Sequence, residues 1–156
     1  MTTVNYQRIA LLYKGFTNPI LRFLVLRFGV GSRGEQDVMR ILRVQGRKSG
    51  RLYDVPVRLA LLDGQHYILS MLGESQWVRN LRTNGIAELI VGKTIEPIRA
   101  YELYGEEKAS FFQWYCKHPK YEMRARTVLS ADTMHLTAAE VDRLAHLYPV
   151  FRLELI

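Results

Sequence analysis

The feature that most constrains the fold is a series of apolar alternations joined by tight turns. From Tyr53 to Leu61 every second residue is apolar, which is the spacing of a strand with one face in a core. Asp63-Gly64 then predicts a two-residue hairpin turn, and a second strand over 66–70 returns beside the first. This pattern predicts an antiparallel sheet built from local hairpins.

The remaining patterns predict further strands and helices in the same arrangement. Strands are expected over 38–45, 86–91, 94–103 and 150–155, with Pro97 indicating an edge or bulge position. Helices are expected over 4–16, 19–28, 77–82, 105–117 and 137–147. We therefore predict an α+β fold, a six-stranded antiparallel barrel with N-terminal helices and helices between strands. Residues 1–156 are expected to form one domain, with 1–34 as a helical extension.

Composition narrows the functional classes. The single cysteine, Cys116, excludes an internal disulfide scaffold, and the four histidines have no metal-ligand spacing. No apolar run is long enough for a transmembrane span or shaped like a secretory signal, so a cytoplasmic protein is expected.

The excess of positive over negative charge lies in the first third of the chain. Residues 1–58 contain 11 Lys and Arg against 3 acidic residues, whereas residues 59–156 contain 11 against 12. A surface with this excess of positive charge attracts polyanions, so nucleic acid, an acidic membrane and a phosphorylated cofactor are all possible partners. A basic surface that contacts only solvent is the alternative. The segment 20–28 is a basic amphipathic helix by its pattern, suited to a membrane surface or to covering one end of the barrel.

Two glycine-rich segments differ in what they support. Gly29 to Gly34 matches a dinucleotide-binding pattern, but a helix precedes it and a strand follows, so it predicts a loop only. Gly46-Arg47-Lys48-Ser49-Gly50 joins two strands. Its glycines free backbone amides to turn toward a ligand, and its side chains supply charge and a hydroxyl, so an anion nest and a solvated basic turn are both open.

Several motifs in a fixed order resemble the deazaflavin-dependent nitroreductase family. They are the Gly46–Gly50 turn followed by Arg51 and Pro56, then Asp63-Gly64, then 73–82 with Trp77 and Asn80, and finally 149–154. The resemblance runs from about residue 18 to the C-terminus. It implies a split β-barrel related to flavin-mononucleotide-binding barrels, and an oxidoreductase that uses coenzyme F420.

The resemblance also implies site residues. The coenzyme phosphate and glutamate tail would be held by Arg47, Lys48 and Ser49. The deazaflavin would be bordered by Asp54, Val55, Pro56, Val57 and Arg58, and by Ser70, Met71, Leu72 and Gly73. The helix that closes the site would contribute Gln76, Trp77, Arg79 and Asn80. Tyr121 or Ser70, or solvent, would protonate the product.

The implied reaction is hydride transfer from reduced deazaflavin to an electron-poor small molecule such as a quinone, an enone or a nitroaromatic. The loop between Ser70 and Trp77 is shorter than in the best-known nitroreductases, so their acceptor specificity is not carried over. A flavin-mononucleotide enzyme on the same barrel, a deazaflavin carrier without turnover, and a nucleic-acid binder are the alternatives, the last without a recognised motif. Either a monomer or a homodimer is expected, and no metal.

Overall fold

The computed structural model describes residues 39–156, apart from the side chain of Val91, and these residues form six strands and four helices. The strands are β1 (Met39–Gln45), β2 (Leu52–Leu62), β3 (Gln65–Leu69), β4 (Ile86–Val91), β5 (Thr94–Glu102) and β6 (Val150–Leu155). The helices are α3 (Gln76–Asn84), α4 (Gly105–Lys117), α5 (Glu122–Thr127) and α6 (Ala138–Leu147). The expected helices over 4–16 and 19–28 lie outside the described residues.

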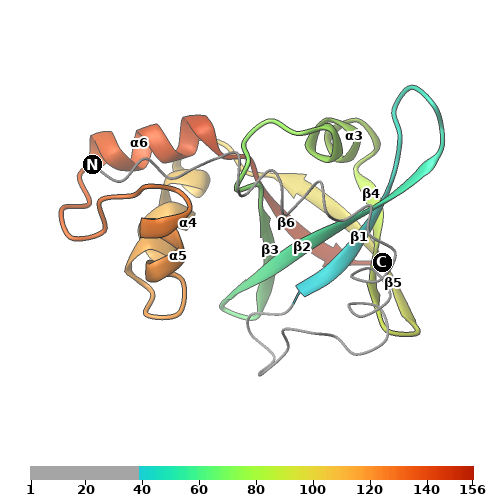
Figure 1. Ribbon diagram of the computed structural model, residues 1–156, viewed down its shortest axis with the longest axis horizontal. Coiled ribbons are helices and arrows are strands. Elements are labelled where there is room, and N and C mark those ends of the chain that lie inside the picture. Colours follow the sequence, from blue (N-terminus) through green and yellow to red (C-terminus); the bar gives the residue numbers. More distant parts are fainter. Residues whose placement is uncertain (1–38) are drawn as a thin grey trace.

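The six strands close into an antiparallel barrel in the order β1-β2-β3-β6-β5-β4 (Figure 1). The β1–β2, β2–β3 and β4–β5 pairs are the hairpins expected from the turns. Pairing of β1 with β4, β3 with β6, and β5 with β6 completes the ring. The predicted α+β antiparallel barrel is confirmed.

Alternation along the strands fills the barrel interior. Leu42 and Val44 of β1 are completely buried, whereas Arg43 between them pairs with Asp54. Two residues of α3, Val78 and Leu81, are also completely buried and belong to the same apolar cluster as the strand residues. Helix α3 therefore closes one end of the barrel and is fixed in place by the barrel core.

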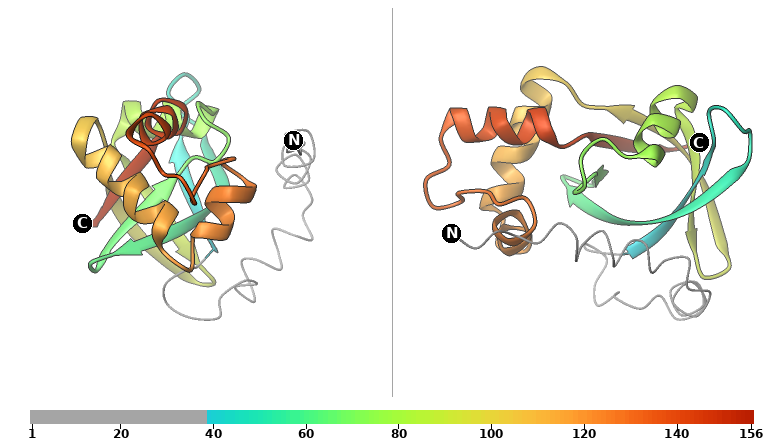
Figure 2. Two further views of the ribbon diagram at one scale, coloured as in Figure 1. Left: turned by 90° about the vertical axis from the view of Figure 1, so that its left-hand side faces the viewer. Right: turned by 45° about the horizontal axis from the view of Figure 1, so that its top comes forward.

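A second apolar layer covers the outside of the barrel. Helices α4, α5 and α6 lie together on one side of it (Figure 2). Their buried residues, including Phe111 and Phe112 of α4, form one cluster with Ala60 of β2, Leu69 of β3 and Val150 of β6. The barrel thus has a helical layer on one side, while α3 and the β1–β2 hairpin tip stand at the other.

Two features differ from the sequence prediction. Helix α5 was not expected, because its six residues are too few for a periodic apolar pattern. Pro97 does not mark an edge strand, since β5 pairs with both β4 and β6. The Pro97 carbonyl accepts a hydrogen bond from the Ile156 amide, just beyond the end of β6. The N and C=O of a strand residue point to the same side, so the Pro97 nitrogen, which has no hydrogen to donate, also points toward the end of β6. Its missing N–H therefore removes no hydrogen bond between β5 and β4.

None of the helices among residues 39–156 is long and apolar enough to cross a membrane. The segment 20–28, for which surface binding to a membrane or cover of the barrel end was expected, lies outside the described residues. Both expectations remain predictions.

Candidate functional site

The tip of the β1–β2 hairpin, residues 46–51, is a turn that its glycines make possible. The Gly46 amide donates to the Arg51 carbonyl at 2.7 Å, and the Gly50 amide donates to the Gly46 carbonyl at 2.9 Å. A Cβ on Gly46 would lie 2.6 Å from both Ser49 Oγ and the Tyr53 ring, and Gly50 has a φ of +67°. A larger residue would displace these two side chains at the first position and strain the backbone at the second.

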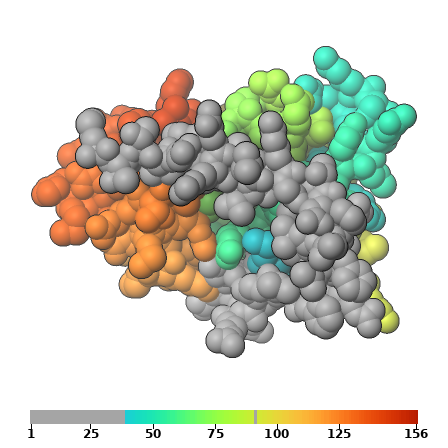
Figure 3. Space-filling view, viewed as in Figure 1, coloured from blue at the N-terminus to red at the C-terminus, as the bar shows by residue number. Residues whose placement is uncertain are grey.

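Arg47 is held against α3 by two amide side chains. Its Nη1 donates to Asn80 Oδ1 at 2.8 Å and to Gln76 Oε1 at 3.0 Å, and its backbone amide also donates to Asn80 Oδ1 at 3.2 Å. One turn further along α3, Asn84 Nδ2 donates to the Gln45 carbonyl at 2.6 Å. These contacts join the hairpin tip to the helix, and the two lie side by side at one corner of the molecule (Figure 3).

A cavity of about 660 Å³ lies between the hairpin tip and α3. It is lined by Gly46, Arg47, Lys48, Ser49, Tyr53, Asp54, Val55, Gln76, Trp77, Arg79 and Asn80. The cavity thus joins the basic turn, the start of β2 and the first turn of α3 around one volume.

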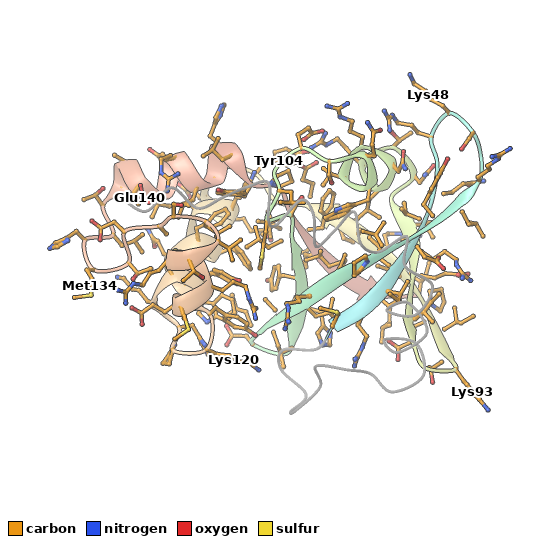
Figure 4. All side chains as sticks on the ribbon, viewed as in Figure 1. Lys48, Lys93, Tyr104, Lys120, Met134 and Glu140 are labelled. Atoms are coloured by element: carbon orange, nitrogen blue, oxygen red, sulfur yellow. The ribbon has the colours of Figure 1, made fainter. Side chains whose placement is uncertain are left out.

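The lining of this cavity is positively charged. Lys48 extends outward from the hairpin tip (Figure 4). Asp54, the one acidic lining residue in the described part of the chain, forms a two-pronged ion pair with Arg43 at 2.7 and 3.0 Å. That hydrogen bond raises the pKa of Arg43, and the positive charge of Arg43 offsets the carboxylate of Asp54. The third cation of the lining, Arg79, forms an ion pair with Glu74 at 3.5 Å, which leaves Arg47 and Lys48 as the lining cations without a carboxylate partner among the described residues.

The hydroxyl groups nearby are arranged in two ways. Ser49 Oγ and the Tyr53 hydroxyl lie 3.1 Å apart at the mouth of the hairpin. Ser75 Oγ, at the start of α3, is buried and has no hydrogen-bond partner among the described residues. A buried hydroxyl without a partner costs free energy, but Ser75 is not among the residues that line the cavity.

All of the sequence-predicted tail-binding and helix residues, and two of those predicted to border the deazaflavin, meet at the cavity. Arg47, Lys48, Ser49, Asp54, Val55, Gln76, Trp77, Arg79 and Asn80 all line it. Gly46 and Tyr53 also line it and were not predicted as site residues, although Gly46 opens the basic turn and Tyr53 begins the apolar alternation.

The other predicted residues lie elsewhere. Pro56 and Arg58 continue β2 beyond the cavity, and Val57 is buried in the barrel core. Ser70, Met71, Leu72 and Gly73 form the turn after β3, where Ser70 Oγ donates to the Gly73 carbonyl at 2.6 Å. Their contact with a deazaflavin ring remains a prediction.

Tyr121 lies in the helical layer, away from the lining of the cavity. Its side chain is almost completely buried, and its ring stacks on Tyr115 with centroids 5.0 Å apart. Its hydroxyl oxygen accepts a hydrogen bond from the Leu61 amide at 3.2 Å. A catalytic role for Tyr121 remains a prediction, because no described contact links it to the cavity.

The barrel, with its helical layer and basic cavity, is an α+β split barrel. Residues 25–137 match the family model of the F420H(2)-dependent quinone reductases. The chain belongs to this family, and is accordingly an F420-dependent reductase by class. No curated protein matches the chain.

Two solved structures are similar in fold. One is described as an F420-H2 dependent reductase, FDR-A; it is 23% identical, with a TM-score of 0.50 over 74% of this chain and 93% of that one. The other is described as a domain-swapped dimer; it is 20% identical, with a TM-score of 0.50 over 90% of this chain and 98% of that one. Both agree with the split barrel.

Proposed function

We propose that the cavity between the hairpin tip and α3 holds the anionic tail of coenzyme F420, and that the enzyme reduces an electron-poor small molecule. The observation that carries this proposal is the pair of cationic side chains, Arg47 and Lys48, that line a cavity whose one described carboxylate is already bound to Arg43. Coenzyme F420 has a phosphodiester and several carboxylates, which are the partners such a cavity favours. Membership of the quinone reductase family supports the same coenzyme.

The residues of the chain fit this ligand in type. Arg47 and Lys48 supply charge-assisted donors, and Ser49 adds a hydroxyl at the same turn. The deazaflavin is proposed to lie along Asp54–Arg58 of β2 and the turn Ser70–Gly73. When bound, the reduced coenzyme supplies a hydride to the acceptor.

The protein's contribution to the reaction is orientation and exclusion of water. Trp77 packs against the barrel core and lines the cavity, so it joins the coenzyme site to the rigid part of the fold. Groups held on such a rigid element lose little freedom when the reactants meet.

The acceptor we propose is a quinone, with an enone or a nitroaromatic as the other members of the same electron-poor class. Reduction of a quinone to a hydroquinone takes one hydride and one proton. We propose that solvent supplies the proton, because the Ser70 hydroxyl hydrogen is given to Gly73 and Tyr121 is buried. Unchanged turnover in Ser70→Ala and Tyr121→Phe supports solvent, and a loss of turnover at unchanged coenzyme affinity in either variant identifies that hydroxyl as the donor.

The experiment that tests the proposal is a titration of the full chain with oxidised coenzyme F420, flavin mononucleotide and single-stranded DNA, followed by fluorescence or anisotropy. Saturable binding of coenzyme F420 alone is expected. Turnover of a quinone with the reduced coenzyme then separates an enzyme from a carrier. Preference for flavin mononucleotide or DNA contradicts the proposal.

The anion site itself is tested by Lys48→Ala and by the Arg47→Ala/Lys48→Ala double variant. A charge-assisted hydrogen bond contributes about 1.5–3 kcal/mol, so each loss should weaken coenzyme binding by about tenfold to a hundredfold, without strict additivity. The effect should shrink as salt is raised, because the hairpin tip is open to solvent. A folded double variant that binds like the wild type at low salt contradicts this site.

A further inference from the structure

The two side chains that hold Arg47 in the cavity carry no charge, whereas several other arginines among the described residues are bound by carboxylates. Both side-chain partners of Arg47 among the described residues are neutral amides, Asn80 and Gln76. Arg43 is bound by Asp54, Arg79 by Glu74, and Arg82 by Glu74 and Glu102.

Asn80 makes the closer and more extensive of the two contacts. Its Oδ1 accepts from both the backbone amide and the guanidinium of Arg47, at 3.2 and 2.8 Å. Asn80 is only 6% exposed and sits on the helix that Val78 and Leu81 fix into the barrel core. The position of Arg47 is thereby tied to the most rigid part of the site.

A carboxylate at position 80 would keep these contacts. Aspartate has nearly the shape of asparagine, and its Oδ atoms accept from the same donors. An ion pair between such a carboxylate and Arg47 would hold the guanidinium at least as firmly, but it would cancel the positive charge that faces the cavity. The amide therefore fixes the geometry of Arg47 and leaves its charge available to a ligand.

We propose that Asn80, assisted by Gln76, is a positioning residue that orients Arg47 for an anion while keeping the cavity positively charged. The identity of the anion as the tail of coenzyme F420 rests on the function proposed above. We call the hold of Asn80 and Gln76 on Arg47 the clamp. The clamp requires only that an anion bind at Arg47. Tripolyphosphate, a small polyanion without a deazaflavin ring, is therefore used as a second probe.

The test compares wild type, Asn80→Asp and Asn80→Ala in the full chain. Thr83→Asp is the matched control, because it adds the same charge to an exposed position of the same helix outside the cavity lining. Binding of coenzyme F420 and of tripolyphosphate is measured at two salt concentrations, and the thermal midpoint of each protein is measured without ligand.

Asn80→Asp is expected to bind both probes about tenfold or more weakly, with an unchanged or raised thermal midpoint, because the ion pair stabilises the fold but removes the free charge. Its binding should also depend less on salt than that of the wild type. Asn80→Ala should weaken binding without gaining stability. Thr83→Asp should change binding by no more than about twofold.

Several outcomes overturn the clamp. The first is wild-type affinity in Asn80→Asp, and the second is a loss of affinity in Asn80→Asp no larger than in Thr83→Asp. The third is a wild-type protein that binds neither coenzyme F420 nor tripolyphosphate. If Asn80→Asp does not fold, Gln76→Glu is decisive, since Gln76 is exposed and its substitution leaves the core intact. Wild-type affinity in Gln76→Glu then overturns the clamp, and weaker binding of both probes supports it.

The clamp and the coenzyme assignment fail in different ways. If the wild type binds tripolyphosphate but not coenzyme F420, and Asn80→Asp loses this binding, the clamp is supported and the coenzyme assignment is wrong. If coenzyme F420 binds equally to wild type and Asn80→Asp, the coenzyme assignment stands and the clamp is wrong.

Discussion

The indole of Trp77 faces the ring of Phe151, with 6.0 Å between the ring centroids and 50° between the planes. Phe151 belongs to β6 and is buried in the barrel, whereas Trp77 belongs to α3 and also lines the basic cavity. The pair therefore connects the barrel core with the wall of the proposed coenzyme site.

Trp77→Ala is expected to lower the free energy of unfolding by about 3 kcal/mol, near the lower end for large core truncations, because the side chain is only partly buried. Coenzyme affinity should fall together with stability. Urea unfolding and coenzyme titration measure the two effects. Trp77→Phe, which keeps an aromatic ring against Phe151, is the control and should lose less of both. If Trp77→Ala unfolds at the same urea concentration as the wild type, Trp77 is an exposed residue over the cavity and not part of the core.

The caps of α3 and α6 predict opposite results for the same kind of substitution. Thr137 Oγ1 accepts a hydrogen bond from the Glu140 amide at 3.2 Å and so caps α6, and Thr137→Ala should therefore cost about 1 kcal/mol. Ser75 caps α3 without a side-chain hydrogen bond and its Oγ is unsatisfied among the described residues, so Ser75→Ala should leave stability unchanged or raise it slightly. Denaturant midpoints of the ligand-free variants check both. Equal losses at the two positions would show that Ser75 has a partner.

Acid sensitivity is expected from the pair of carboxylates around Arg82. Burial alone would raise the pKa of Glu102, but hydrogen bonds from Arg82 and Tyr104 outweigh it, so the pKa is lowered. The hydrogen bond from Arg82 likewise lowers the pKa of Glu74. A lowered folded-state pKa means that the unfolded chain binds the proton more readily. The stabilisation is therefore complete above the ordinary value of 4.5 and is lost as the pH falls below it.

Arg82→Gln removes the partner of both carboxylates. The variant should be less stable than the wild type at pH 7, and this difference should shrink as the pH is lowered from 5 to 3. Urea midpoints of both proteins across that range measure it. A difference that stays constant with pH would mean that Arg82 contributes through packing and not through the two carboxylates.

Cys116 is expected to be unreactive in the folded protein. The side chain is completely buried, and burial raises the pKa of its thiol to about 11. The thiolate, which is the reactive form, is therefore scarce at neutral pH. Iodoacetamide should label Cys116 only after denaturation. Rapid labelling of the native protein would contradict this burial.

Local patterns predicted the barrel because each hairpin carries its own turn and its own alternation. The Asp63-Gly64 turn and the alternation of β2 depend on neighbouring residues only. The contact between Arg47 and Asn80 joins residues 33 positions apart, so no local pattern reports it. The basic turn and the Trp77–Asn80 motif were both identified, but only the structure shows that the asparagine faces the arginine.

The position of Tyr121 was equally inaccessible to the sequence. A tyrosine beside His118-Pro119 fits a pocket wall and a packed core equally well. The choice depends on α5, a helix too short to predict, which follows Tyr121 and packs its buried Ala125 into the helical layer. Tertiary packing, and not residue type, decides where such a ring lies.

The closed ring of strands has a consequence for the order in which the chain folds. β3 ends at Leu69, and its partner β6 begins at Val150, so this seam joins segments that are far apart in the sequence. During synthesis the hairpins form early, but the ring stays open until β6 has left the ribosome, since non-local pairings form late. Until then β3 and β5 each expose an unpaired edge, the kind of surface on which aggregation begins. Pairing of the six-residue strand β6 with both of these edges thus removes the surface on which misassembly would begin.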